Sequence, residues 1–281
     1  MAALENKIDF VALISVTNAN CNGDPLNGNR PRTDYNGMGE ISDVCIKRKF
    51  RNRMQDMGYA IFVQSDDRCD DGCKSLSDRA AAATKGIKDR SIYAQTACEK
   101  WMDVRSFGQV FAFKSTDKNG VSVGVRGPVS IHQAVSISPV EIEEMRITKS
   151  VNGETGEKRA SDTMGMKHFV RFGLYEIKGA INVQLAEKTG FTREDAAVIK
   201  ECLRTLFVND ASSARPEGSM EVVKLYWWEH NCKDGQYSSA KVHRSVHVTP
   251  KNAEGLPQCV DDYEIILDEL PGLTPEIIDG L

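Results

Sequence analysis

The residues of this chain that could bind a ligand are concentrated between positions 30 and 53. Five basic side chains lie close together there: Lys47, Arg48, Lys49, Arg51 and Arg53. They follow a loop rich in asparagine and glycine that carries Arg30 and Arg32 on either side of a proline. Cationic groups beside amide and backbone donors suit a polyanion, and the backbone of a nucleic acid is such a ligand. The sequence therefore predicts phosphate binding.

Two neighbouring elements would position these groups. Residues 18–41 should form a long loop, because Asn, Gly, Pro and Asp favour turns. Ser42 is a candidate N-cap for a helix that runs to Met57. One apolar stripe follows from the spacing of Ile46, Phe50, Met54 and Met57. The basic side chains are then expected on the exposed face of this helix.

Metal binding has weaker support. Cys69 and Cys73 could form half of a zinc site, but no second pair at a usual finger spacing completes it, and the eight cysteines are read as reduced thiols. Four acids could hold Mg²⁺, although such loop acids are typical of solvated turns: Asp66, Asp67, Asp70 and Asp71. His243 and His247 would share one side of a predicted strand as surface histidines. Neither a metal nor another cofactor is expected.

Catalysis also has little support. The sequence holds no Ser-His-Asp, G-x-S-x-G or P-loop pattern. Asp24 and Asp34 lie beside the expected phosphate path and are the acids that could support backbone cleavage, but a turn-forming role is favoured. These residues therefore identify no catalytic constellation.

Composition is that of an ordinary soluble protein, with 281 residues, 41% apolar and 27% charged. The net charge of −4 is unevenly distributed: residues 252–281 hold eight acids and no Lys or Arg, so residues 1–251 carry +4. No apolar run reaches the roughly 18 residues that span a bilayer, and the first residues lack a signal-peptide core. A cytoplasmic protein without membrane contact is expected.

The order of elements predicts an α+β fold. A strand at 8–16, the basic helix and a short strand at 59–63 would form the first half of a ferredoxin-like arrangement, with the two strands parallel. A strand at 168–186, a helix from Thr192 to Val208 and a strand at 219–228 would form the second half. Edge strands are expected at 242–248 and 263–268.

Two insertions interrupt this pattern. Helical patterns at 77–83 and 92–101 predict an inserted helical module, and 121–138 then reads as one or two strands with a kink at Gly127 and Pro128. Residues 141–167 contain an Asn-Gly pair between two β-like arms, which predicts a hairpin. Such a hairpin cannot bury its own surface, so it should project and dock on something else.

The stretches V-T-N-A-N-C-N-G-D-P, N-R-P-R-T-D and S-D-V-C-I-K-R-K-F-R resemble the backbone subunit of type I CRISPR Cascade complexes, a family of the RAMP superfamily, and specifically its subtype I-C branch. The similarity extends through F-V-R-F-G-L-Y and N-D-A-S-S-A-R-P, and so covers nearly the whole chain. It implies a hand: an RRM-like palm, helical fingers and a hairpin thumb. The implied ranges are palm at 1–63, 121–140 and 168–281 (with an acidic C-terminal tail), fingers at 64–120 and thumb at 141–167.

The resemblance also implies an activity and its residues. Copies would stack along one CRISPR RNA, pair the guide with target DNA, and contact the capping, large and small Cascade subunits. Lys47 and Arg51, one helical turn apart, would hold phosphates, and either Met164 or Met166 would wedge at a displaced base. The other implied RNA-binding residues are Asn18, Asn20, Asn22, Arg30, Arg32, Arg48, Lys49, Ser212, Ser213 and Arg215.

Two alternatives remain at this point. Type III relatives of the family cut RNA with an acid of the equivalent loop, which would make Asp24 or Asp34 catalytic. A general RNA-binding scaffold protein would show no preference for repeat-derived RNA. The expected function is the non-catalytic one, because sequence recognition can be left to base pairing while the protein binds only the guide backbone.

Overall fold

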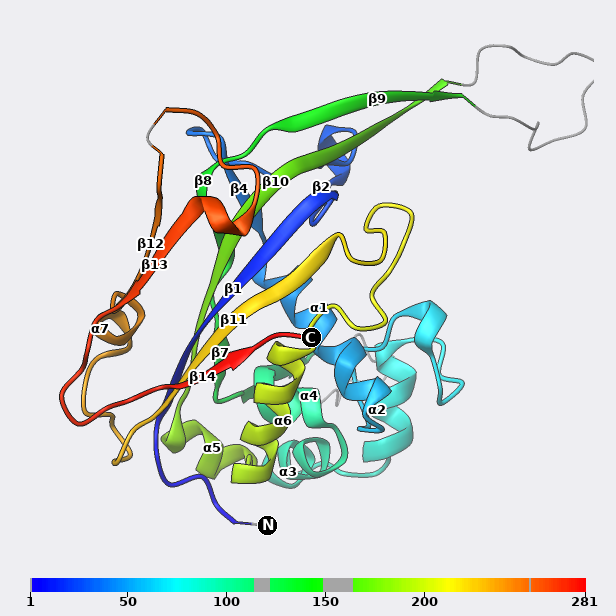
Figure 1. Ribbon diagram of the computed structural model, residues 1–281. Helices are drawn as coiled ribbons and strands as arrows, with labels where there is room; N and C mark the ends of the chain where they lie inside the picture. Colours follow the sequence, from blue (N-terminus) through cyan, green and yellow to red (C-terminus); the bar gives the residue numbers. More distant parts are fainter. Residues whose placement is uncertain (1, 114–121, 149–163, 253) are drawn as a thin grey trace, which may run out of the picture.

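A central antiparallel sheet runs through the molecule (Figure 1), of which the computed structural model describes residues 2–113, 122–148, 164–252 and 254–281. The strand order is β14-β11-β1-β10-β8-β4, and β7 and β9 pair with other parts of β10. The bounds are Ile8–Ala19 (β1), Met38–Ile41 (β4), Val129–Ile131 (β7), Ala134–Pro139 (β8), Ile142–Thr148 (β9), Met164–Ile181 (β10), Met220–Glu229 (β11) and Glu276–Asp279 (β14). Within the described ranges, no helix is long and apolar enough to cross a membrane.

Four of these strands have the ferredoxin-like arrangement. Strands β11, β1, β10 and β8 are adjacent in that order, and each neighbouring pair is antiparallel, so β1 and β8 run parallel with β10 between them. The predicted α+β fold with a ferredoxin-like palm is therefore confirmed. The predicted strand at 59–63 is wrong, because that segment is irregular. Strand β8, which follows the insertion, occupies the place in the sheet that this segment was expected to fill.

A buried carboxylate explains why residues 59–63 do not form a strand. The backbone N–H of Phe62 donates to Asp103 Oδ1 at 2.7 Å, and that of Val63 donates to Oδ2 at 3.1 Å. Arg51 Nε donates to the same Oδ2 at 2.9 Å, and the Asp103 side chain is only 1% exposed. The apolar side chains are buried as the pattern suggested, but their backbone donors bind a side chain instead of a neighbouring strand.

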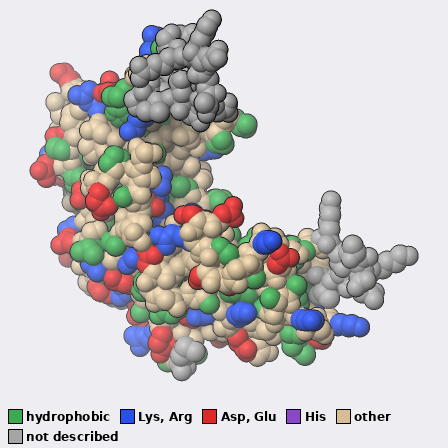
Figure 2. Space-filling model, turned by 90° about the vertical axis from the view of Figure 1, so that its right-hand side faces the viewer, with side chains coloured by type: hydrophobic (Ala, Val, Ile, Leu, Met, Phe, Trp, Pro, Cys, Tyr) green, Lys and Arg blue, Asp and Glu red, His purple; other side chains and the backbone are tan. Residues whose placement is uncertain are grey.

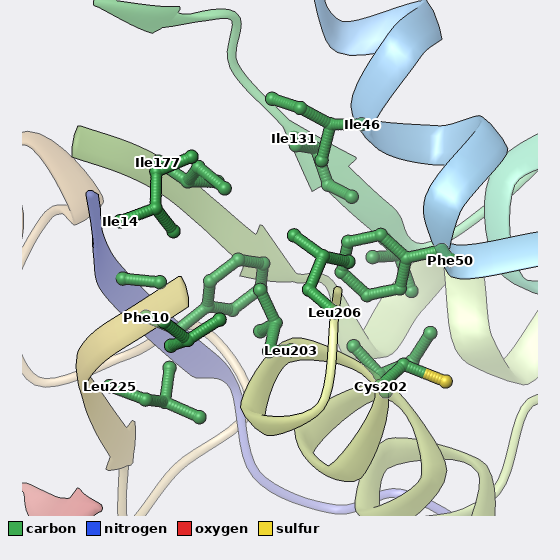
Figure 3. Packing of buried hydrophobic residues seen from close by; sticks show 14 of the residues in the cluster. Phe10, Ile14, Ile46, Phe50, Ile131, Ile177, Cys202, Leu203, Leu206 and Leu225 are labelled. Atoms are coloured by element: carbon green, nitrogen blue, oxygen red, sulfur yellow. The ribbon is translucent and has the colours of Figure 1, made fainter. Parts of the chain in front are cut away.

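Helices α1 (Asp43–Asp56) and α6 (Arg193–Arg204) cover one face of the sheet. The hydroxyl oxygens of Ser42 and Thr192 accept the N–H groups of Cys45 and Asp195, as expected of N-caps. The buried stripes fit together over β1 and β10 (Figure 3), where Phe50 of α1 lies near Leu203 and Leu206. The prediction of both helix starts, and of the buried face of α1, is confirmed.

One helix and one strand end earlier in the structure than the sequence predicted. The helix that begins after Thr192 ends at Arg204 instead of Val208. The strand predicted to continue to Ala186 ends at Ile181. Asn182 stops it, because its Oδ1 accepts the N–H of Leu185 at 2.8 Å and caps a further helix, α5 (Val183–Thr189).

The opposite face of the sheet is covered by the C-terminal part of the chain. Helix α7 (Ser239–His243) and the paired strands β12 (Val246–Pro250) and β13 (Tyr263–Leu267) lie over it, and a 3₁₀ turn, η3 (Val260–Asp262), precedes β13. Tyr226 and Trp228 are buried under this layer. The predicted strand at 263–268 is confirmed, whereas the one at 242–248 begins only at Val246.

The insertion forms a unit with its own core. It contains η2 (Asp66–Arg68), α2 (Leu76–Thr84), α3 (Arg90–Lys100), α4 (Met102–Phe107) and the strand pair β5 (Gly108–Phe111) and β6 (Val123–Arg126). The helices predicted at 77–83 and 92–101 are confirmed. Phe62, Trp101 and Phe111 pack against one another in its centre, with ring centroids 4.8–6.5 Å apart. Arg105 joins this unit to α6, since its Nε and Nη2 donate to the Asp195 carboxylate at 2.9 and 2.7 Å.

Strands β9 and β10 form the arms of the predicted hairpin. Their register pairs Met164 with Thr148, Met166 with Arg146 and Val170 with Ile142. The arms extend away from the rest of the sheet (Figure 1). The Asn-Gly pair of the predicted tip lies outside the described residues.

The prediction of a surface histidine on a strand is correct for His247 and wrong for His243. His243 lies on helix α7 and is 5% exposed, whereas His247 lies on β12 with its Nε2 2.7 Å from Asp268 Oδ2. His243 Nε2 is 3.0 Å from the carbonyl oxygen of Gly179 and 3.8 Å from Asp9 Oδ1. His230 Nε2 lies 2.8 Å from Asp9 Oδ2, and both of these side chains are fully buried. His243 therefore belongs to the packing of α7 on the sheet.

Acidification from pH 7 to pH 5 should lower thermal stability through His243. Burial lowers the pKa of His243, although the Gly179 carbonyl and Asp9 act in the opposite direction. The unfolded chain then binds the proton more readily than the folded one, so this contribution is complete above about pH 6.5 and is lost as pH falls through the folded pKa. The Tm should fall by roughly 3 °C for each unit of depression.

Differential scanning calorimetry of the wild type and His243→Gln across this pH range tests the assignment. The variant keeps an amide donor near the Gly179 carbonyl but cannot titrate, so its Tm should vary less with pH. An identical pH dependence in the two proteins would contradict it.

Candidate nucleic-acid interface

Three segments that are distant in the sequence converge on one open groove of about 400 Å³. They are the loop after β1, the arms of the β9–β10 hairpin, and the loop between α6 and β11. The lining residues are Asn20, Gly28, Asn29, Ile147, Met166, Lys167, His168, Ser213 and Ala214. The backbone N–H of Asn20 donates to the carbonyl oxygen of Ala214 at 2.9 Å and holds two of these segments together.

The loop after β1 is folded by its own polar side chains. It contains β2 (Gly23–Asp24), η1 (Pro25–Asn27) and β3 (Arg30–Pro31) before β4 begins. Asn18 is exposed and has a left-handed φ of 51°, which asparagine tolerates better than most residues. Asn22 Oδ1 accepts the N–H of Ser42 at 2.9 Å, so it joins this loop to the start of α1.

The expected exposed basic face of α1 is not observed. Lys49 is buried and forms an ion pair with Asp210, while Arg51 binds the buried Asp103 and lies over the Phe107 ring, 5.4 Å from its centroid. Arg48 Nη1 donates to the carbonyl oxygen of Val63 at 2.6 Å. The sequence-based expectation is wrong because α1 has the insertion on one side and the α6–β11 loop on the other.

Lys49 shows how the positive charge of α1 is balanced by a nearby carboxylate. Burial lowers the pKa of Lys49, while the nearby Asp210 carboxylate opposes that shift. Arg215 Nε also donates to Asp210 Oδ2, at 3.1 Å. Two cations thus share one carboxylate, and Arg215 is the more exposed of the two, at 28% against 4%. With Lys49 and Arg215 protonated and Asp210 ionised, the three side chains together carry one net positive charge.

The other predicted cations are also paired. Lys47 Nζ lies 2.9 Å from Asp43 Oδ2, and Arg32 Nη2 lies 3.3 Å from Asp24 Oδ1. Arg30 forms an ion pair with Glu144 of β9 and so links the loop to the hairpin. Figure 2 shows basic and acidic side chains interspersed over the face in view, in agreement with this pairing.

The hairpin arms bring apolar side chains to the groove. Met164 and Met166 are 63% and 47% exposed, and Met145 and Ile147 on the opposite arm are exposed to a similar degree. Of the two methionines in the predicted site, Met166 lines the groove. Large apolar side chains that remain exposed in an isolated chain favour a partner surface.

Sequence reasoning missed six of the nine groove residues, and two of these six, Lys167 and His168, have titratable side chains. Among the described residues, Lys167 has no carboxylate within 4 Å, which makes it the groove cation most available to a ligand. Its neighbours Met166 and His168 alternate with it along β10. The available signal was the basic, polar character of a hairpin that cannot bury itself, but register alone did not show which side chains meet the loops.

The two candidate catalytic acids stabilise turns. Asp24 Oδ1 accepts the N–H of Leu26 at 3.2 Å, and Asp34 Oδ1 accepts the N–H groups of Asn36 and Met38 at 2.8 and 2.9 Å. Within the part of the chain that the structure describes, no group of three His, Cys, Asp or Glu side chains is arranged to hold a metal ion.

Comparison with known proteins gives consistent matches. The family model described as CRISPR-associated protein Cas7 matches residues 6–268. A CRISPR-associated protein Cas7 from Haloferax volcanii is 25% identical to the chain over 293 aligned positions, covering 98% of this chain and 85% of that protein. A chain of a solved structure titled "CRISPR RNA-guided surveillance complex, pre-nicking" is similar in fold, with a TM-score of 0.54, 15% identity, and coverage of 84% of this chain and 81% of that one.

Proposed function

Because the chain belongs to the CRISPR-associated protein Cas7 family, we propose that it is a non-catalytic, RNA-binding backbone subunit of a type I-C Cascade complex. Copies of it bind side by side along one CRISPR RNA and present the guide for pairing with target DNA. The observation that carries this proposal is the groove in which the loop after β1, the hairpin arms and the α6–β11 loop meet.

The character of the groove supports binding of a backbone. Its lining offers amides, a hydroxyl, backbone groups and one lysine, together with the apolar Ile147 and Met166. Phosphate and sugar are contacted by such groups whatever the base sequence, which is what a protein that accepts many guides requires. Both faces of the sheet are covered by the chain itself, which disfavours stacking of bases on the sheet.

In this proposal, most basic residues of α1 make contacts within the protein instead of binding phosphates. Arg51 mainly joins α1 to the insertion through Asp103, and Lys49 mainly balances Asp210. Lys47 remains the candidate phosphate contact of α1, since it is partly exposed and its partner Asp43 is itself half-exposed. Charge reversal at both Lys47 and Arg51 would therefore confound binding with folding.

The proposal also assigns parts of the chain to the palm, the fingers and the thumb. The sequence-based ranges serve with one change: 1–63, 127–140 and 168–281 as palm, 64–126 as fingers because β6 pairs with β5 in the insertion, and 141–167 as thumb. The exposed apolar side chains of the hairpin arms favour docking of the thumb on a second copy, where Met166, or Met164 beside it, would wedge at a displaced base. The capping, large and small subunits would complete the complex.

The turn-forming contacts of Asp24 and Asp34 favour a subunit without nuclease activity, because their carboxylates are already engaged by backbone donors. The proposal therefore assigns target cleavage to another component.

Co-purification tests the proposal. The protein is expressed together with its partner subunits and CRISPR RNA, and the bound nucleic acid is sized and sequenced. A large particle that holds discrete, repeat-flanked RNA is the expected result. Recovery of unselected cellular RNA would favour a general scaffold protein, and a particle without RNA would overturn the proposal.

A further inference from the structure

One side chain of the groove carries a buried hydrogen-bond acceptor that lacks a partner. Asn20 is 5% exposed, and its Oδ1 has no hydrogen-bond partner among the described residues. Its side-chain and backbone N–H groups both have partners: Nδ2 donates to the carbonyl oxygen of Asn29 at 2.6 Å, and the backbone N–H donates to the carbonyl oxygen of Ala214. A buried acceptor left unsatisfied costs free energy that a ligand donor would recover.

The orientation of this amide follows from its neighbour. The Asn29 carbonyl oxygen can only accept hydrogen bonds, so the NH₂ group of Asn20 must face it. The atom left for a ligand is therefore Oδ1, and the ligand must supply a donor.

Because the ligand must donate a hydrogen bond to Asn20 Oδ1, only some groups of a nucleic-acid backbone can bind there. Phosphate oxygens are acceptors at neutral pH, and the bases change from guide to guide. The ribose 2′-hydroxyl is the backbone group that donates at every nucleotide, and DNA lacks it. We propose that Asn20 Oδ1 accepts a hydrogen bond from a ribose 2′-hydroxyl and thereby selects RNA over DNA; this inference rests on the proposed binding of RNA in the groove.

A second observation points to a polar ligand at the same place. His168 also lines the groove, and its buried Nδ1 has no hydrogen-bond partner among the described residues; the nearest carboxylate oxygen, on Glu144, is 3.8 Å away. Asn20 and His168 therefore bring two buried, unpartnered polar atoms to the lining of one groove.

The test compares two RNAs on the unmodified, full-length protein. An oligouridine with 2′-hydroxyls and one with 2′-fluoro groups share a similar sugar pucker, but the fluoro group cannot donate. Their affinities, measured by fluorescence anisotropy at one salt concentration, should differ by roughly fivefold for each hydroxyl contacted. Equal affinities would overturn the inference without any substitution in the protein.

Asn20→Ala then assigns the contact. The preference for hydroxyl over fluoro RNA should collapse in this variant, whereas Asn27→Ala, which removes an exposed asparagine of the same loop, should retain it. A preference that persists in Asn20→Ala overturns the assignment. The two proposals fail differently: absence of RNA binding by the wild type refutes the proposed function, whereas equal binding of the two RNAs refutes only the role of Asn20.

Discussion

Replacement of Asp103 by alanine should lower the free energy of unfolding by about 3–5 kcal/mol. The Asp103 carboxylate accepts the backbone N–H groups of Phe62 and Val63 and the Nε of Arg51, and it is almost fully buried. The substitution would leave two backbone donors and one mostly buried guanidinium without their partner. Urea denaturation followed by circular dichroism measures the change.

A matched control is Asp78→Ala, which removes an exposed aspartate from the first turn of α2. Its effect should stay within about 0.5 kcal/mol. A loss below about 1 kcal/mol in Asp103→Ala would show that water replaces the carboxylate, and the proposed link between the insertion and α1 would have to be abandoned.

Removal of Lys167 and Arg146, two cations of the described hairpin arms, should produce the largest loss of RNA binding. Lys167 lines the groove, Arg146 lies opposite Met166 in the strand register, and neither has a carboxylate within 4 Å among the described residues. If each contacts one phosphate of a single strand, Lys167→Ala with Arg146→Ala should reduce the slope of log K against log salt by about 1.4. Affinity at 0.1 M salt should then fall roughly 25-fold.

Lys85→Ala with Lys88→Ala provides the control, since it removes the same charge from exposed lysines of the insertion. Binding isotherms over a series of salt concentrations should give this double variant the wild-type slope. An equal slope change in both double variants would indicate a diffuse electrostatic effect, and the groove would lose its special role.

Local signals carried most of the successful predictions. The start of α1 follows from Ser42 and the apolar spacing behind it, which act within one or two turns of chain. The same is true of Thr192 and α6. The prediction of a strand at 59–63 failed because its outcome depends on a distant residue. Asp103, whose carboxylate accepts the Phe62 N–H, lies 41 residues further along the chain. No pattern within residues 59–63 could reveal it.

The candidate site shows the same limit. Asn20, Met166 and Ser213 were predicted and do meet in the groove. The charge state of the basic helix could not be foreseen, because Lys49 is neutralised by Asp210, 161 residues away. Residue type and periodicity indicate which side chains have a charge to offer, whereas the tertiary fold decides which of those charges is already bound.

The two buried carboxylates described above also limit how this chain can be divided. The insertion supplies Asp103 to Arg51 of α1 and Arg105 to Asp195 of α6, so each side of the boundary provides one anion and one cation. A shortened chain without residues 64–126 would leave Arg51 and Asp195 without these partners and would uncover the side chain of Phe62. The insertion is therefore not a removable module, and the two parts should unfold in one cooperative step.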